Sequence, residues 1–578
     1  MAGPRRRGLL AAMLGTAAIP GRAAAYVALH GAHQSVQTRI DAGAHLQRIE
    51  NLFIDVPHER LVSVSTDGTI RFWDLGTGEP QRVIWLPSSS ANTVQKSGMS
   101  RSGALLAVGI FSGNGTSLLL FRDKDEPVIR PMPDVVSAVA FAPDDQSVAI
   151  ATQQEVTVLT LPDFRPVLHD TFADVVWALD FDQHGALAVG SFAGEVRLYD
   201  AAHKLVARGR PKAGEEITDL RFSPDGTLIA LGFNSGLGNE VLRVRALQPA
   251  GILRPREGSP TEFARVSWMG GTTLLTSASE SGSTAGKRPR YFVLEWTIGA
   301  AGNSIGDARV KLRSTGDLLT LSAVPDTGSF AVGLWNGALF RASGSGQIWG
   351  AAAGKIYFDE ENADRLFTSD NGLTVALESP NPERAFRLDL LAGRLTAGGD
   401  TASLHPPVRA VPGLTVTIDD GITINGTEAP LDRWESVSGW AIDAKFGDVF
   451  VATRFHLRRY TRDAASVWAI APGAEAWAVS VTNDGRYVIA TLGDGTIRWY
   501  ETREGGLVLS VFVHADRRRW VAWTAGGYFT GSDDASSLLK GFKAEFYSPA
   551  PMRPMDPAAF EREFHTPELL TRLFAQVK

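Results

Sequence analysis

A turn of one form recurs along this chain at nearly constant spacing, and no other sequence feature constrains the fold as much. Each turn consists of polar residues that end in Gly or Asp, and a short apolar run follows it. Four consecutive turns end at Gly103, Asp145, Gly185 and Gly226, at intervals of 42, 40 and 41 residues. The flanking segments place apolar residues at every second position, which is the period of a half-buried strand. The repeat predicts a unit of roughly 40 residues that contains three or four short antiparallel strands.

One such unit cannot bury both faces of its sheet, so the units must pack on one another. A ring of sheets, the β-propeller, buries both faces and leaves only short edges exposed. About twelve or thirteen units of this length fit between residues 40 and 540, whereas one ring typically holds about four to eight. The sequence therefore predicts an all-β chain with two tandem propellers of six or seven blades each.

Composition places the predicted domain boundaries. Residues 26–345 are assigned to the first propeller and residues 346–545 to the second, with the junction placed in the Gly/Ala/Ser-rich stretch 342–354. Residues 546–578 are predicted to form a short helical tail. Docking of this tail on the second propeller is one interpretation, and presentation to a partner is the other. The apolar face of the tail consists of Phe560, Phe564, Leu569, Leu570, Leu573 and Phe574.

The first 25 residues have the order of an export signal. Arg5, Arg6 and Arg7 precede a short apolar run, and small residues follow at positions 23–25. Consecutive arginines before the run resemble a twin-arginine signal. We therefore expect residues 1–25 to direct export to the periplasm, and a cytoplasmic protein with an N-terminal extension is the alternative. The run from Leu9 to Ile19 is too short to span a bilayer, so no membrane span is predicted.

The charge and the cysteine count argue against several classes of function. The net charge is −6 with no basic stripe, so we expect no nucleic-acid partner. The chain contains no cysteine, which excludes disulfides, thiol nucleophiles and Cys-ligated metals. Its 11 histidines form no motif with metal-ligand spacing. We predict that the chain is not an enzyme and takes no cofactor. The alternative is a propeller enzyme or ligand binder with a metal or quinone cofactor in a channel.

The first full repeat resembles a WD repeat. His45, Ser65, Asp67, Trp73 and Asp74 occupy the positions at which that family has its characteristic residues. The resemblance implies a hydrogen-bonded network between strands, in which the buried Trp N–H finds an acceptor. Most other repeats depart from the motif, so the network is not expected in every blade.

Segments near both ends of the chain resemble a narrower group. Residues 38–55, 476–500 and 520–542 are similar to bacterial WD-repeat proteins that are often fused to a caspase-like peptidase. Because the chain has no cysteine, the Cys–His dyad of that peptidase cannot form here. The expected function is a non-catalytic scaffold or sensor that binds other proteins. The sensor subunit of a split caspase-like system is a further alternative.

Two tryptophans are candidate partner-binding residues. Trp177 and Trp477 each lie four residues before the last apolar residue of a predicted innermost strand, which lines the channel of a propeller. The matching positions of other repeats hold small or polar residues such as Ser137 and Thr218. A Trp at a channel mouth is a suitable anchor for a partner protein. Ordinary packing between blades is the competing explanation.

Overall fold

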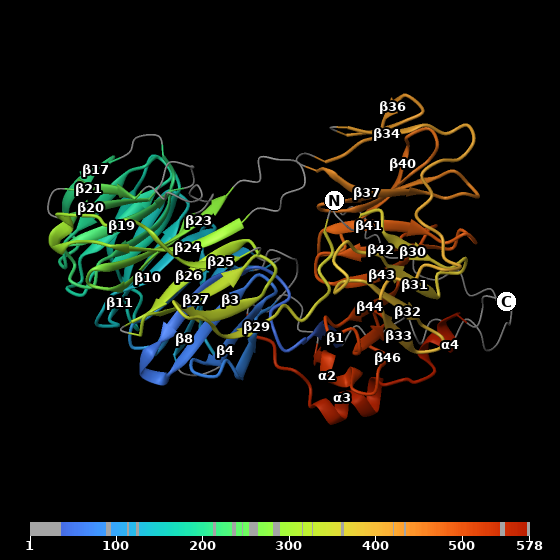
Figure 1. Cartoon of the computed structure of the whole chain (residues 1–578), viewed down its shortest axis with the longest axis horizontal. Coiled ribbons are helices and arrows are strands. Elements are labelled where there is room, and N and C mark those ends of the chain that lie inside the picture. Colours follow the sequence, from blue (N-terminus) through green and yellow to red (C-terminus); the bar gives the residue numbers. More distant parts are fainter. Residues whose placement is uncertain are drawn as a thin grey trace, which may run out of the picture.

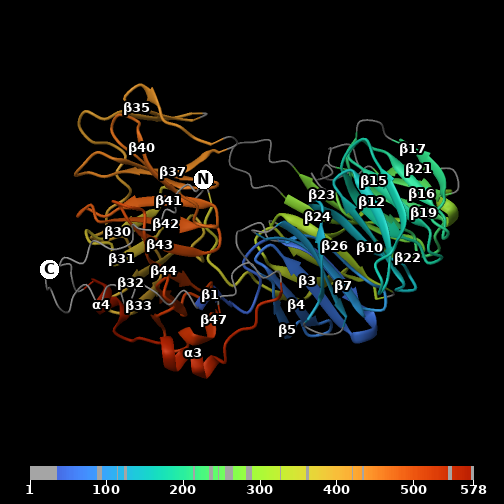
Figure 2. The same cartoon turned by 180° about the vertical axis from the view of Figure 1, so that it is seen from behind.

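The computed structural model contains two β-sheet parts that lie side by side (Figures 1 and 2). The first propeller comprises residues 49–351, and the second part comprises residues 355–574 together with strand β1 (Val36–Ile40). The predicted export signal lies outside the described residues and stays a prediction. The structure describes residues 36–574 except 88–93, 113–114, 123–125, 212–214, 234–238, 245–246, 254–263, 281–289, 315, 326, 360–362, 420, 433–434 and 544–549.

Seven four-stranded antiparallel sheets make up the first propeller, in agreement with the predicted all-β class and with six or seven blades. The first four sheets are β2–β5 (Ile49–Asp55, Arg60–Ser65, Thr69–Asp74, Pro80–Trp85), β6–β9 (Val94–Met99, Leu105–Ser112, Gly115–Arg122, Val128–Met132), β10–β13 (Val136–Phe141, Ser147–Thr152, Glu155–Thr160, Pro166–Thr171) and β14–β17 (Val176–Phe181, Leu187–Ser191, Val196–Tyr199, Leu205–Gly209). The other three are β18–β21 (Ile217–Phe222, Leu228–Phe233, Asn239–Arg243, Gln248–Leu253), β22–β25 (Val266–Gly270, Thr273–Glu280, Arg290–Thr297, Arg309–Ser314) and β26–β29 (Leu318–Val324, Ser329–Leu334, Leu339–Ser343, Gly346–Ala351).

The ring closes by side-chain packing. The innermost strand of each sheet contacts those of its neighbours in chain order, and β26 of the seventh sheet contacts β2 of the first. At this junction Trp349 packs in one apolar cluster with Leu61 and Trp73. Its Nε1 donates to the backbone oxygen of Leu75 at 2.9 Å, and Arg341 donates to the same oxygen at 2.8 Å. The first and last blades are therefore joined by side-chain contacts, and each of the two sheets consists of consecutive strands.

The second part contains four larger sheets, each of which is formed by strands that are consecutive in the chain. A short pair, β1 with β47 (Leu539–Lys543), completes it. The four sheets are β30–β33 (Leu366–Thr368, Thr374–Leu377, Phe386–Asp389, Arg394–Ala397), β34–β36 (Val416–Ile418, Ile422–Ile424, Thr427–Glu428), β37–β40 (Val437–Ile442, Val449–Thr453, Leu457–Tyr460, Ser466–Ile470) and β41–β46 (Ala476–Val481, Tyr487–Leu492, Thr496–Glu501, Leu507–Val513, Trp520–Trp523, Phe529–Gly531).

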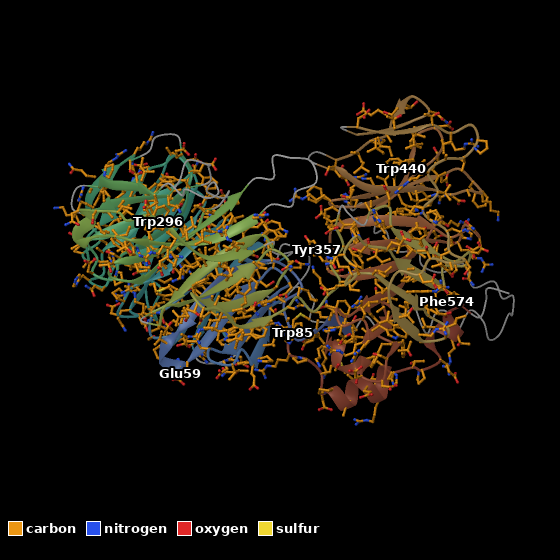
Figure 3. The ribbon with its side chains drawn as sticks, in the orientation of Figure 1. Glu59, Trp85, Trp296, Tyr357, Trp440 and Phe574 are labelled. Atoms are coloured by element: carbon orange, nitrogen blue, oxygen red, sulfur yellow. The ribbon has the colours of Figure 1, made fainter. Side chains whose placement is uncertain are left out.

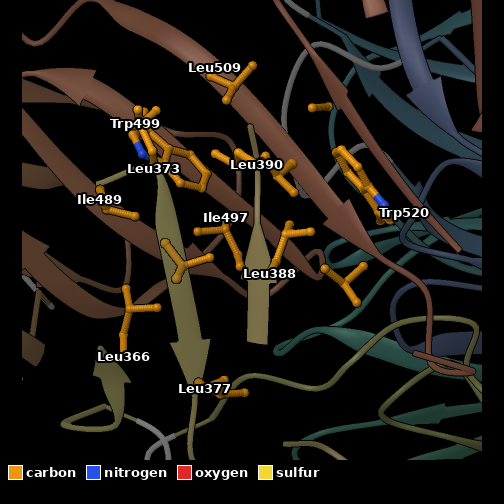
Figure 4. Packing of buried hydrophobic residues seen from close by; sticks show 14 of the residues in the cluster. Leu366, Leu373, Leu377, Leu388, Leu390, Ile489, Ile497, Trp499, Leu509 and Trp520 are labelled. Atoms are coloured by element: carbon orange, nitrogen blue, oxygen red, sulfur yellow. The ribbon is translucent and has the colours of Figure 1, made fainter. Parts of the chain in front are cut away.

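The first and last of these sheets share the largest apolar cluster. Figure 4 shows leucines of β30–β32 beside apolar residues of β42–β44. Trp499 of β43 is fully buried there, and its Nε1 donates to the backbone oxygen of Gly372 at 2.9 Å. The first and last sheets of this part therefore pack directly on one another.

The predicted six or seven blades are wrong for the second part, in which the described residues form four larger sheets. Two features account for the difference. One sheet takes up six strands, β41–β46, where division by repeat length assigns more than one blade. Residues 398–415 also contain no strand. A mean repeat length therefore overestimates the number of sheets.

Strand β1 joins the second part, although it precedes the first propeller in the sequence. It pairs antiparallel with β47, from Val36 opposite Lys543 to Ile40 opposite Leu539. The last strand of the first propeller ends at Ala351, whereas the predicted boundary is residue 345. The first propeller is thus inserted between β1 and the rest of the second part. Figure 3 marks Trp85 and Tyr357 in the region where the two parts meet.

The predicted helical tail is confirmed. Helices α3 (Pro557–Phe564) and α4 (Leu569–Phe574) follow the short helix α2 (Ala535–Leu538). Phe560 and Phe564 join the cluster formed by β1 and β44–β47, and Leu573 joins the cluster of β30–β33 and β41–β45. All six predicted apolar residues are buried, so the tail docks on the second part. Among the described residues, no helix is long and apolar enough to cross a membrane.

Candidate functional site in the channel of the first propeller

A β-bulge marks the channel mouth of the first propeller. Near the start of β2, β6, β10, β14, β18 and β26 the pairing register shifts. A bulge leaves a residue unpaired and re-aims its side chain. The residues skipped are Glu50, Lys96 with Gln95, Ser137, Trp177, Thr218 and Leu319. In the sixth sheet Arg265 directly precedes β22 and also lines the channel.

A cavity of about 320 Å³ follows the inner strands, and all of these positions except Gln95 and Leu319 line it. This volume falls at the lower end of the range of ligand pockets, about 300–1,000 Å³. The basic residues of its lining are Lys96, Arg101, Arg221 and Arg265. The acidic residues are Glu50, Asp180 and Asp219. The channel is therefore a polar site with a small excess of positive charge.

Glu50 holds two cations at the mouth. Its carboxylate lies 3.0 Å from Nζ of Lys96 and 2.7 Å from Nε of Arg48. Burial opposes ionisation of Glu50, but the nearby Lys96 and Arg48 outweigh it and lower its pKa. Burial also lowers the pKa of Lys96, and Glu50 counteracts this effect. The guanidinium of Arg48 lies 5.2 Å from the ring centroid of Trp335, which is 41% exposed.

Trp177 lies at this mouth, as its position in the sequence predicts. It is half-buried and stacks on Phe192 with a centroid distance of 5.0 Å. The ammonium of Lys96 lies 5.1 Å from the centre of its ring. The indole therefore has a cation on one side and an aromatic ring on another.

Three buried polar atoms of the lining make no hydrogen bond among the described residues: Oγ of Ser137, Nε1 of Trp177 and Oγ1 of Thr320. Ser137 is 3% exposed and Thr320 is 6% exposed. Unpaired buried polar groups are costly and therefore call for an explanation. All three groups can donate a hydrogen bond, since two are hydroxyls and the third is an indole N–H. A hydrogen-bond acceptor in the channel would therefore satisfy them.

Trp477 occupies the equivalent bulge of β41, but its surroundings differ. It packs against the apolar cluster shared by β30–β33 and β41–β45. Its predicted role in partner binding stays a prediction. The contact with this cluster is of the kind that ordinary packing between blades, the alternative explanation, requires. Sequence position alone could not distinguish the two tryptophans, because both are skipped by the same kind of bulge.

The predicted WD network forms in the first sheet, but Ser63 takes the place predicted for Ser65. His45 Nδ1 lies 3.1 Å from Asp67 and its Nε2 lies 2.7 Å from Oγ of Ser63. Trp73 Nε1 donates to the same Ser63 oxygen at 2.8 Å. The prediction of Ser65 for this role is wrong: its hydroxyl donates to the backbone oxygen of Gln47 at 3.0 Å.

Two further details of the network differ from the resemblance. Asp74 bonds its own turn, where its carboxylate accepts from the backbone N–H groups of Gly76 and Thr77. Thr69 joins the network and lies 3.0 Å from His45 Nδ1. Burial lowers the pKa of His45, against the opposing effect of Asp67. The site is a structural clamp between strands.

One group of potential metal ligands lies in the second part. Asp432, Glu435 and His456 place their ligand atoms within 4.8 Å of one another. Arg458 lies among them, with its guanidinium 2.6 Å from both carboxylates. Burial disfavours ionisation of Glu435, but bonds from Arg458 and Thr453 lower its pKa to about 2. Because Arg458 pairs with both carboxylates, these residues form an ion-pair network.

Comparison with known proteins gives two similarities. The family described as WD domain, G-beta repeat matches residues 44–74, which span the WD network. Among solved structures, the chain is similar to the β-propeller domain of Cps50 (Swd1) from Myceliophteria thermophila. The identity is 13%, the match covers 51% of this chain and 95% of that one, and the TM-score is 0.40. The search of curated proteins gave no match. The seven-sheet ring makes this chain a β-propeller protein, and its first repeat is similar to the WD family.

Proposed function

We propose that the chain is a non-catalytic scaffold that binds another protein at the channel mouth of its first propeller. The supporting observation is Trp177, a half-buried tryptophan at the mouth whose Nε1 makes no hydrogen bond among the described residues. Tryptophan is enriched among the residues that contribute most to protein interfaces. Exposed Trp335 widens the aromatic surface at the same mouth.

Affinity capture with the full chain tests this function. We expect Trp177→Ala to reduce recovery of the bound protein at least about tenfold, because interface anchors contribute about 2 kcal/mol or more. Its melting temperature should stay close to that of the unmodified chain, since Trp177 belongs to no apolar cluster of the described residues. Mass spectrometry identifies and quantifies the captured protein.

Trp477→Ala is the matched control. It removes the same side chain from the equivalent bulge, where the indole packs against the core of the second part. We expect a lower melting temperature and unchanged capture from the chain that remains folded. Equal capture by the Trp177 variant and the unmodified chain would contradict the proposal.

A further inference from the structure

The charges at the channel mouth are unevenly matched. Arg48, Lys96 and Arg265 lie near the carboxylate of Glu50, which already pairs with Arg48 and Lys96. Asp219 also attracts the charge of Arg265, but its carboxylate pairs with Arg221 at 3.3 Å. Arg265 donates instead to two backbone oxygens, those of Leu319 at 2.8 Å and Thr218 at 3.1 Å. No carboxylate lies within ion-pair distance of its guanidinium in the part of the chain that the structure describes. Burial lowers the pKa of Arg265, and the attraction of Asp219 and Glu50 offsets this only in part. A further anion near the guanidinium would therefore stabilise its charge.

The unpaired donors lie at the same level of the channel. Ser137 and Trp177 occupy the bulge positions that follow Lys96 around the ring, and Thr320 is adjacent to the bulge in the seventh sheet. The ammonium of Lys96 lies over the ring of Trp177, so the cation and the free indole N–H belong to one site. An ionised carboxylate accepts hydrogen bonds, so it would pair with these unpaired donors, and its negative charge would complement the cations beside them.

We propose that the mouth of the first propeller binds the carboxylate of an Asp or Glu side chain presented by the partner protein. This inference rests on the proposed function and adds the chemistry of the partner. The incoming carboxylate would accept bonds from Lys96, Arg265 and the free donors of Ser137 and Trp177. Glu50 competes with it, because Glu50 already holds Lys96.

Calorimetric titration with synthetic peptides tests the inference. Hexaglutamate is the probe and hexaglutamine is its uncharged counterpart, at low ionic strength because salt screens such contacts. We expect the unmodified chain to bind hexaglutamate and not hexaglutamine. Lys96→Gln and Arg265→Gln should each weaken binding at least about tenfold, the effect of losing a charged hydrogen bond. Arg165→Gln makes the same charge change at a side chain that is 75% exposed, and it should leave binding unchanged.

Glu50→Gln gives the most specific result. Loss of the internal competitor should strengthen hexaglutamate binding, a change in the direction opposite to that of the cation variants. Lys96→Arg keeps the charge and should retain binding, which guards against a general loss of folding in Lys96→Gln. Melting curves of every variant accompany the titrations.

Three results would overturn the inference: absence of binding by hexaglutamate, equal binding of hexaglutamine, or unchanged binding in both cation variants. Inorganic phosphate that displaces the peptide at equal concentration would assign the site to free anions instead. If capture still depends on Trp177 while hexaglutamate fails to bind, the proposed scaffold function stands and only the carboxylate chemistry fails.

Discussion

Ser63 and Ser65 lie two positions apart on β3 and therefore face the same side of the sheet. Both are buried, but only Ser63 accepts a hydrogen bond from the indole of Trp73 and meets the ring of His45. Alternation in the sequence identifies the face and leaves the choice between the two hydroxyls open. Which hydroxyl bonds the Trp73 and His45 rings depends on how β3 pairs with β4, where Leu61 lies opposite Trp73 and Ser63 lies opposite Arg71.

Substitution of each serine distinguishes their roles. Ser63→Ala leaves the Trp73 N–H and a His45 nitrogen without a partner in a buried site, so we expect a loss of about 1–3 kcal/mol in the free energy of unfolding. Ser65→Ala removes bonds to the backbone oxygen of Gln47 and the backbone N–H of Asp67, and it should cost about 1 kcal/mol. Urea unfolding followed by tryptophan fluorescence measures both values. A larger loss for Ser65→Ala would restore the original assignment.

At the scale of strands and sheets, local repetition explains what could be predicted. In the first propeller the turns recur at equal intervals, and each repeat supplies one sheet from consecutive strands, so the number of sheets follows from the spacing. In the second part β41–β46 adds two strands to one sheet, and no turn motif marks the addition. The position of Trp177 at the mouth was predictable for the same reason, because it shares its place in the repeat with Ser137. Lys96 and Arg265 were not singled out from the sequence, since their convergence depends on closure of the ring.

The junction of the first and seventh sheets offers a test of ring closure. Gly78 has φ +77°, and a Cβ placed on it would lie 2.4 Å from the ring of Trp349. Trp349→Ala should cost about 3–5 kcal/mol by leaving a cavity in the cluster that closes the ring. Gly78→Ala should also destabilise the chain, through the clash and through the positive φ.

The two effects should not add. In the Trp349→Ala background the clash at Gly78 disappears, so the second substitution should cost less than it does alone, by about 0.5 kcal/mol or more. Urea unfolding of the four proteins of this cycle measures the coupling. Strict additivity would show that Gly78 and Trp349 act independently at the junction.

At the scale of the whole molecule, the sequence contains no signal for the connection between the two parts. Nothing in the residues of β1 indicates a partner strand near the other end of the chain, at Leu539–Lys543. Arg39 of β1 then reaches into the first propeller, where it donates to the backbone oxygen of Leu86 at 2.9 Å and lies over the ring of Trp85. This connection therefore depends on long-range contacts, which repeats and local motifs do not encode.

Lys355 lies where the chain enters the second part, and its burial makes the stability of the whole molecule depend on pH. It is 5% exposed, and its Nζ donates to the backbone oxygen of Gly493 at 2.5 Å. Burial lowers its pKa from 10.5 to about 8, although Asp494 and Asp67 oppose the shift. Between these two values the unfolded chain carries a proton on this amine that the folded chain lacks. The free energy of unfolding should therefore rise with pH across this window, by about 3 kcal/mol at most.

Lys355→Met removes the titrating group and keeps an apolar stem of similar length. We expect its stability relative to the unmodified chain to be constant below pH 8 and to fall steadily from pH 8 to 10.5, because only the unmodified chain gains stability there. Urea unfolding at half-unit steps of pH gives the difference directly, and subtraction cancels the titration of all other groups. Parallel curves for the two proteins across this window would show that Lys355 keeps its proton when the two parts are assembled.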